Sequence, residues 1–218
     1  MLDVAKPVGE LVLESPQCAD VLAKYHIDYC CRGHLTLAEA CEKIGLDPQT
    51  IATELQAAID RVEPRPVDPR NLTTPDLLHY IQVTYHDTLR DALPRLMKES
   101  RELAKLQKGG DPRFDQLDQT IQALGDLLLP HLGREEHELF PLAAAGNLTP
   151  QLRRELAAMR REHEDVGRVL RHLTRVRLAL GPAPLSSLFG RLEQLESDLR
   201  RHLHLEIHAL APRFVTQA

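Results

Sequence analysis

The stretch HLGREEHELFP at residues 131–141 returns as HLHLEIHALAP at residues 202–212, and this repeat decides how the rest of the chain is interpreted. Six of the eleven positions match at a shift of 71 residues, among them His131 with His202 and Glu135 with Glu206. With 11 His and 17 Glu in 218 residues, chance alone predicts about one His-x-x-x-Glu pair. The aligned pair of motifs is therefore more informative than either motif alone.

Apolar residues at spacings of three and four lead into both motifs and place them on the core side of amphipathic helices. The second and fourth helical patterns end on a histidine and a glutamate, while the first and third carry one histidine each in the apolar stripe. The stripes are Leu117, Ile121, Leu124, Leu128 before His131 and Glu135; Leu188, Leu192, Leu195, Leu199 before His202 and Glu206; His86, Leu89, Leu93, Leu96; and Leu152, Leu156, Met159, His163, Val166.

Proline and glycine mark the ends of these patterns and define the fold class. Helix-start pairs occur at Thr74-Pro75, Asp111-Pro112, Thr149-Pro150 and Ala183-Pro184, and glycines at 109–110, 146 and 181 mark the stops. Four helices of about thirty residues with short connections predict an all-α, up-down-up-down four-helix bundle. Pro94 and Pro130 fall inside two of the helices and are expected to kink them.

The N-terminal third differs from the rest in charge and in cysteine content. Residues 1–66 hold 6 basic and 11 acidic residues, and this difference accounts for the whole net charge of −5. The same residues include all four cysteines. Short helices are expected there after Ser15-Pro16, after a capping box at Thr36 with Glu39, and after Asp47-Pro48. We predict a small helical domain over residues 1–62, a proline-rich linker over 63–73 and the bundle over 74–218.

Composition also excludes several classes of protein. Negative net charge with four Tyr, four Phe and no Trp gives no support to nucleic-acid binding. No apolar run approaches the roughly 20 residues of a membrane span, and the opening MLDVAKP does not resemble a signal peptide. We therefore expect a cytoplasmic protein without a membrane partner.

Six core polar side chains suggest a metal centre. They could be ordinary polar groups satisfied by hydrogen bonds, but burying four imidazoles and two carboxylates without a strong partner would cost several kcal/mol. Two carboxylates from opposite helices can bridge two cations while the imidazoles cap the pair. Nitrogen and oxygen donors without sulfur suit iron or manganese, and zinc could occupy the same site. The six residues are His86, His131, Glu135, His163, His202 and Glu206.

The motifs resemble those of the hemerythrin-like di-iron proteins of the iron-sulfur cluster repair group. The resemblance covers nearly the whole chain. It comprises an N-terminal module with Asp28-Tyr29-Cys30-Cys31-Arg32-Gly33, followed by Tyr85-His86-Asp87, His131-x-x-x-Glu135-Glu136, Glu162-His163-Glu164 and His202-x-x-x-Glu206. The resemblance implies that the four histidines are terminal iron ligands and that Glu135 and Glu206 are bridging carboxylates. The implied cofactor is two non-haem iron ions with an oxo or hydroxo bridge.

The resemblance also implies a function, with alternatives left open. A di-iron protein of this group helps to restore iron-sulfur clusters damaged by nitric oxide or oxidants, for instance as an iron donor, and its partners are the damaged iron-sulfur proteins. The alternatives are an enzyme that reduces nitric oxide or peroxide at the di-iron centre, and a module that binds or senses nitric oxide or O2. The sequence leaves these three open, together with a homodimeric state.

Several other residues are weaker candidates for a functional role. Cys30 and Cys31 are interpreted as a redox or iron relay, against the alternative that they are small buried apolar residues, which is how we interpret Cys18 and Cys41. His79 is expected to be a core histidine or to support a ligand, and Glu138 to lie just outside the ligands. Surface positions are expected for His137, His204 and His208, and for the arginine pairs at 153–154 and 160–161.

Overall fold

The computed structural model describes residues 2–61, 68–181 and 186–214, and within these ranges the chain consists of helices joined by turns and loops, without strands. The one extended pairing among them is an isolated bridge between Pro7 and Thr36. The chain divides into two compact units, Leu78–Leu199 and a second one formed by Met1–Leu77 together with Arg200–Ala218. The all-α fold class predicted from the sequence is confirmed.

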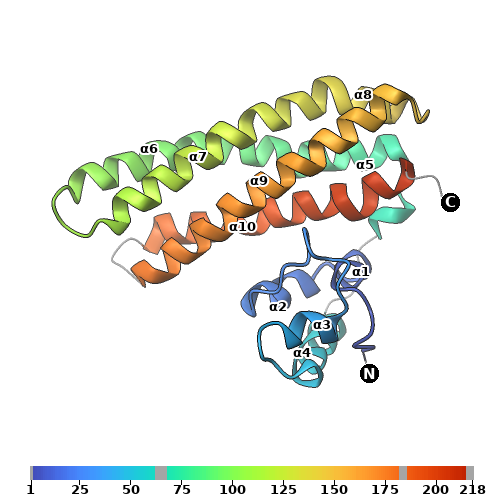
Figure 1. Ribbon diagram of the computed structural model, residues 1–218, viewed down its shortest axis with the longest axis horizontal. Coiled ribbons are helices and arrows are strands. Elements are labelled where there is room, and N and C mark those ends of the chain that lie inside the picture. The colour runs from blue at the N-terminus through green and yellow to red at the C-terminus, as the bar shows by residue number, and fades with distance from the viewer. Residues whose placement is uncertain (1, 62–67, 182–185, 215–218) are drawn as a thin grey trace. The chain divides into compact units, whose positions relative to one another are not determined.

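Long helical runs make up the unit Leu78–Leu199 (Figure 1), and α7 packs against both α6 and α9. Short π-helical segments, labelled η2 and η3, interrupt the first two runs. The elements are η2 (Gln82–His86), α6 (Asp87–Leu106), α7 (Arg113–Arg134), η3 (Glu135–Leu139), α8 (Phe140–Ala144), α9 (Pro150–Leu180) and α10 (Ser186–Leu205), the last of which continues into the other unit.

The ends of these helices follow the sequence signals. Thr149 caps α9 by accepting a hydrogen bond from the backbone N–H of Leu152, with Pro150 at the first helical position. Gly181 ends α9 with a positive φ of 70°, a conformation that glycine adopts without a steric penalty. The signal at Ala183-Pro184 lies outside the described residues, and α10 begins just after it.

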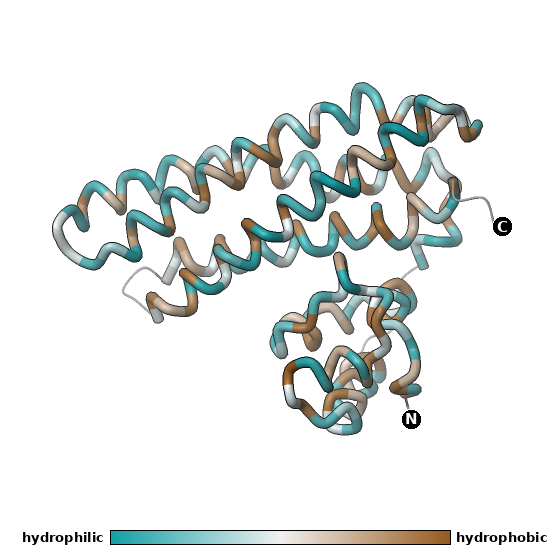
Figure 2. The backbone as a smooth tube through the Cα atoms, in the orientation of Figure 1, coloured by the Kyte–Doolittle hydropathy of each residue, from teal (hydrophilic) through white to brown (hydrophobic). Residues whose placement is uncertain are grey.

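The apolar stripes form the core of the bundle. Leu117, Ile121, Leu124 and Leu128 of α7 are all completely buried, as the spacing of three and four predicts. Hydrophobic positions recur along the helices in Figure 2, between hydrophilic positions. Each buried leucine contributes roughly 1.5–3 kcal/mol of transfer free energy, so the stripes provide the main stabilisation of the bundle.

The two internal prolines leave the helices intact. Pro94 lies within α6 and Pro130 within α7, and both helices run through these positions without a break. The π-helical segments lie elsewhere, and each contains or begins at one of the six core polar residues. The kinks expected at Pro94 and Pro130 stay a prediction.

Short helices build the other unit. The capping box of Thr36 with Glu39 forms as predicted, and Asp47 caps the helix that begins at Pro48. The elements are α1 (Val8–Glu14), α2 (Cys18–Lys24), α3 (Leu37–Glu42), α4 (Pro48–Asp60), a 3-10 turn η1 (Pro69–Asn71), α5 (Thr74–Ile81, which continues into the bundle), π-helical η4 (Glu206–Leu210) and a 3-10 turn η5 (Ala211–Phe214).

The C-terminal segment packs with the N-terminal helices in this unit. Arg201 donates hydrogen bonds to Asp20 (2.6 Å) and to the carbonyl oxygen of Pro16 (3.3 Å). Residues 62–67, most of the proline-rich stretch, lie outside the described residues, and the turn η1 comes soon after them. The boundaries 1–62, 63–73 and 74–218 stay a prediction.

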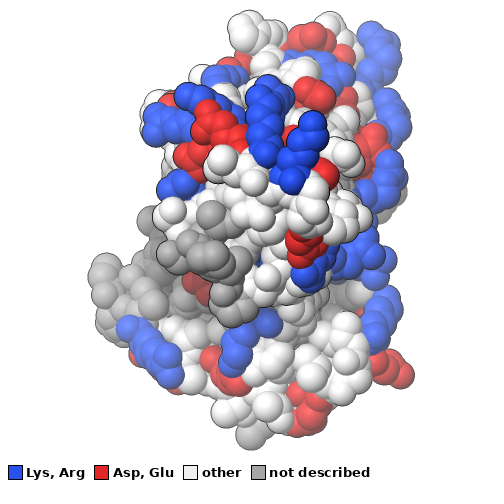
Figure 3. Space-filling model, turned by 90° about the vertical axis from the view of Figure 1, so that its left-hand side faces the viewer, with Lys and Arg blue, Asp and Glu red and all other residues white. Residues whose placement is uncertain are grey.

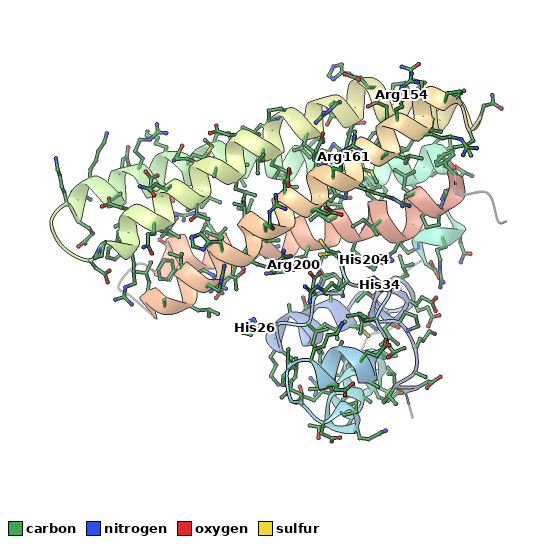
Figure 4. All side chains as sticks on the ribbon, in the orientation of Figure 1. His26, His34, Arg154, Arg161, Arg200 and His204 are labelled. Carbon is green, nitrogen blue, oxygen red and sulfur yellow. The ribbon has the colours of Figure 1, made fainter. Side chains whose placement is uncertain are left out.

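The surface of the chain is charged and mixed in sign. On the face drawn in Figure 3, Lys and Arg side chains lie among Asp and Glu side chains. The arginine pairs at 153–154 and 160–161 are exposed on α9, as expected, and Figure 4 labels Arg154 and Arg161 along that helix. Among the described residues, no helix combines the length and the apolar character that crossing a membrane requires.

A buried ion pair in α9 and α10 gives a first testable prediction. Arg177 donates to the buried carboxylate of Glu196 (Nε–Oε1 2.9 Å), so Arg177→Ala should lower the free energy of unfolding by about 2 kcal/mol by removing one charged hydrogen bond from a buried anion. Arg95→Ala is the control, because its pair with Asp91 is about two-thirds exposed and should change the stability by less than about 0.5 kcal/mol. Urea unfolding measures both, and equal losses would contradict the assignment.

Candidate metal centre

Six polar side chains lie in the apolar interior at the ends of the leucine stripes. His86, His131, Glu135, His163, His202 and Glu206 each expose 2% of their surface or less. All six were singled out from the sequence as core positions. The α-helical spacing that placed them is therefore correct up to the first residue of η3 and of η4, and onward from His86 at the end of η2.

Glu135 lies at the centre of three imidazoles. Its Oε1 lies 3.3 Å from His131 Nε2 and 3.7 Å from His163 Nε2, and its Oε2 lies 3.5 Å from His86 Nε2. The Nε2 atoms of His131 and His163 are 3.2 Å apart. Two imidazole nitrogens that bind one cation at about 2.1 Å and at an angle near 100° are separated by about that distance. These nitrogens can thus converge on one ion.

His202 and Glu206 repeat this relation on the segment formed by α10 and η4. They are separated by one turn, and His202 Nε2 lies 3.2 Å from Glu206 Oε2. Both side chains are fully buried. The second copy of the sequence repeat therefore has the same local geometry as the first.

The ligating atoms fall into two groups whose members all lie within 4.8 Å of one another. One group comprises His86, Glu135, His202 and Glu206, and the other comprises His131, Glu135, His163 and Glu206. The two carboxylates belong to both groups, whereas each histidine belongs to one. Buried nitrogen and oxygen donors in this arrangement fit a metal site.

Two further carboxylates orient two of the four histidines. Glu136 accepts a hydrogen bond from Nδ1 of His86 (2.9 Å), and Glu162 accepts one from Nδ1 of His131 (2.8 Å). Because the proton is held on Nδ1, the lone pair of Nε2 points to Glu135 in both rings, which is the tautomer that binds metal. Arginines hold the carboxylates in turn, Arg90 on Glu136 (3.0 Å) and Arg134 on Glu162.

These contacts set the charge of the orienting carboxylates. Burial by itself would raise the pKa of Glu136, but the hydrogen bonds from His86 and Arg90 outweigh it and lower the pKa below its usual value. For Glu162, burial is likewise outweighed by His131, with further lowering from Arg134, so its pKa is lowered as well. Both groups are therefore anions at neutral pH and effective acceptors.

Spacing along one helix does not reveal these orienting residues. Glu136 comes directly after Glu135, but its carboxylate reaches His86 on a neighbouring helix. Glu138, expected just outside the ligands, is exposed, and His79 is exposed rather than in the core. His137 lies on the surface as predicted.

A proline follows the π-helical turn at two of the ligands. In η3 the backbone N–H of Phe140 donates to the carbonyl of Glu135, and in η4 that of Ala211 donates to Glu206, five residues back in both cases. Each acceptor lies six residues before a proline, Pro141 or Pro212, which has no N–H and would crowd an α-helical turn. Both copies of the sequence repeat therefore combine a π-helical turn that begins at the ligand with the same Glu-x5-Pro spacing.

His204 and His208 are not surface residues, contrary to expectation. His204 Nδ1 donates to the carbonyl oxygen of Tyr29 (3.3 Å) and His208 Nε2 donates to that of Cys30 (2.8 Å). Burial, followed by the nearby His208, lowers the pKa of His204 to about 3, so its ring is neutral. Figure 4 labels His204 on α10. The helix face opposite the ligands therefore holds the segment that carries the cysteines.

None of the four cysteines forms a disulfide. Cys30 is buried and Cys31 is half-buried, with their Sγ atoms 3.8 Å apart. The hydrogen bond to Cys31, then burial and the Asp28 carboxylate, raise the pKa of the Cys30 thiol well above its usual value. Cys18 and Cys41 are completely buried, as expected of structural cysteines. Burial raises the pKa of Cys18 to about 12.

Comparison with protein families gives matches to both parts of the chain. Residues 78–214 match the hemerythrin HHE cation binding domain, the larger of the two matches. The chain belongs to this hemerythrin family. Residues 4–59 match the ScdA_N domain, described as a domain of unknown function.

Full-length relatives of this hemerythrin-family chain share both parts. The iron-sulfur cluster repair protein YtfE of Escherichia coli O17:K52:H18 is 29% identical over 213 residues, which covers 95% of this chain and 96% of the relative. Proteins of the same name from Shigella boydii serotype 4 and Citrobacter koseri have the same identity and coverage. The family resemblance noted in the motifs is confirmed.

Gly33 gives a second prediction, because its neighbours leave no room for a side chain. A Cβ there would lie 2.4 Å from His208 Nε2 and 2.4 Å from the carbonyl oxygen of Tyr29. Gly33→Ala should therefore lower the free energy of unfolding by about 2 kcal/mol, measured by urea unfolding. Gly190→Ala, on the exposed side of α10 with no atom within 4 Å, should be neutral or stabilising by about 0.5 kcal/mol. Equal effects would contradict this account of Gly33.

Proposed function

We propose that the protein binds two iron ions in the bundle and uses this centre in the repair of damaged iron-sulfur clusters. The proposed ligands are His86 and His202 for one ion and His131 and His163 for the other, with Glu135 and Glu206 shared between them. The observation that carries the proposal is the membership of both carboxylates in both groups of ligating atoms. A carboxylate has two oxygens and can therefore bridge two cations.

The surroundings of the proposed ligands support a redox-competent centre. When bound, iron would supply Lewis-acid and one-electron chemistry in this core. Glu136 and Glu162 hold the proton on Nδ1 of His86 and His131, so that Nε2 can bind. The ring of Phe140 stacks on His86 with centroids 5.2 Å apart, and the leucine stripes limit access of water.

The repair function rests on the relatives together with the donor set. Proteins named for iron-sulfur cluster repair match almost the whole chain, including both the cysteine-bearing segment and the HHE domain. Damaged iron-sulfur proteins are accordingly the proposed partners, and nitric oxide or O2 the proposed small ligands. We infer that Cys30 and Cys31 relay iron or electrons, and that the protein works in the cytoplasm, where thiols stay reduced.

The test is a repair assay that follows the iron as well as the activity. The chain is loaded with an iron isotope under anaerobic conditions and added to a cluster enzyme inactivated by nitric oxide; recovery of activity and appearance of the isotope in the enzyme are expected. The controls are the same amount of ferrous iron with reductant, and the Glu135→Ala variant. Recovery no faster than with free iron would contradict iron donation. Consumption of nitric oxide without recovery would favour the reductase alternative.

A further inference from the structure

The segment Asp28-Tyr29-Cys30-Cys31 folds into a turn that brings one carboxylate and two sulfurs together. Asp28 Oδ1 accepts hydrogen bonds from the backbone N–H of Cys31 (2.9 Å) and from the thiol of Cys30 (3.2 Å). The two Sγ atoms are 3.8 Å apart. All three ligating atoms lie within 4.8 Å of one another.

These distances match the dimensions of a tetrahedral metal site. Two thiolate sulfurs bound at about 2.3 Å to one tetrahedral ion lie about 3.8 Å apart, whereas a disulfide would bring them to about 2.05 Å. A carboxylate oxygen bound at about 2.1 Å to the same ion lies about 3.2–3.6 Å from each sulfur. The observed separations of 3.8 Å between the sulfurs and 3.2 Å from Cys30 Sγ to Asp28 Oδ1 fit one cation, and the ligating atoms of Cys31 and Asp28 lie within 4.8 Å of each other.

Hydrogen bonds and a ring contact fix the position of this turn. His208 Nε2 and His204 Nδ1 donate to the carbonyl oxygens of Cys30 and Tyr29, and the ring of Tyr29 meets that of His204 edge-on. Gly33 leaves room for His208 at this point. Cys31 and Asp28 are half-buried, so the turn is held by hydrogen bonds at its base and reaches solvent at its edge. This is the combination expected of a site that loads and releases an ion.

We propose that Asp28, Cys30 and Cys31 form a second cation site, which binds one ferrous ion through two thiolates and one carboxylate and leaves a fourth position for exchange. The inference deepens the proposed repair function by identifying where iron in transit would be held. On binding, two sulfur–metal bonds and one oxygen–metal bond form in place of bonds from the ion to water, and the two thiol protons pass to solvent, with no change in oxidation state. Thiolates favour ions such as ferrous iron and zinc over magnesium or calcium.

Cobaltous ion is the probe, because thiolate ligation gives it a charge-transfer absorption in the near ultraviolet that nitrogen and oxygen ligands do not give. Titration of the full chain, reduced and anaerobic, should produce this band together with tetrahedral absorption in the visible, saturating at one thiolate-bound ion per chain. Cys30→Ser and Cys31→Ser should each abolish the band or weaken the binding at least a hundredfold. Asp28→Asn, whose amide oxygen can still accept from Cys31, should weaken binding about tenfold.

Matched variants separate this site from the centre in the bundle. Cys41→Ala, at a buried cysteine of the same unit, should keep the band. His163→Ala, which removes a proposed ligand of the bundle, should also keep it while losing iron from the bundle. Absence of the band in the unaltered chain, its survival in both serine variants, its loss in Cys41→Ala, or unchanged affinity in Asp28→Asn would overturn the proposal. If His163→Ala instead retains its iron, the proposed function fails and the cysteine site stands.

Discussion

Glu135→Ala is expected to leave the protein with less than half of the iron that the unaltered chain holds. Glu135 lies within 3.3–3.7 Å of three imidazole nitrogens and belongs to both groups of ligating atoms, so its loss removes a donor and a negative charge from both proposed ions. Iron per chain after anaerobic reconstitution measures the effect, and circular dichroism checks the fold. Glu206→Ala should behave in the same way.

Neighbouring glutamates provide graded controls for this prediction. Glu136→Ala should keep two irons but release them to a chelator about tenfold faster, because it frees the ring of His86 without removing a ligand. Glu136→Gln should release iron more slowly than Glu136→Ala, since the amide oxygen can still accept from Nδ1 of His86. Glu138→Ala, on the exposed face, should have no effect. The assignment is wrong if Glu138→Ala loses as much iron as Glu135→Ala.

The sequence predicts most of the bundle because its signals are local. Apolar spacing within one helix places Leu117 and Leu128 in the core, and Thr149 and Gly181 set helix ends through contacts with their own backbone. The same spacing finds the six buried polar residues, since a ligand that projects into the core follows the period of the apolar stripe. Fold class and candidate ligands therefore come from the same pattern.

The sequence does not reveal contacts between segments that lie far apart in the chain. Glu136 and Glu162 orient histidines on neighbouring helices, and nothing in the period of one helix specifies such a partner. His204 and His208 look exposed in a helical projection because the face opposite the core is usually solvated, but here it is covered by the turn at residues 28–31. Pairs of histidines facing away from a core stripe could have signalled a second packing surface.

Replacing both cysteines of the turn with serine is expected to slow repair at least tenfold while leaving the iron in the bundle. Cys30 and Cys31 belong to neither group of nitrogen and oxygen donors, so Cys30→Ser/Cys31→Ser should retain two irons per chain and the absorption of the centre. If the thiols relay iron or electrons, recovery of a damaged cluster enzyme should slow at least tenfold. The measurement pairs iron analysis with the repair assay on the same preparation.

Two control variants test whether repair depends on the thiols themselves and on the position of the turn that carries them. Cys18→Ala changes another buried cysteine of the same unit and should repair at the normal rate. His208→Ala keeps both thiols but removes the hydrogen bond to the carbonyl of Cys30, so it should slow repair less than the double substitution. Loss of iron in the serine variant would make the thiols ligands of the bundle centre. Full repair without them would return Cys30 and Cys31 to a structural role, because a relay cannot operate without its sulfurs.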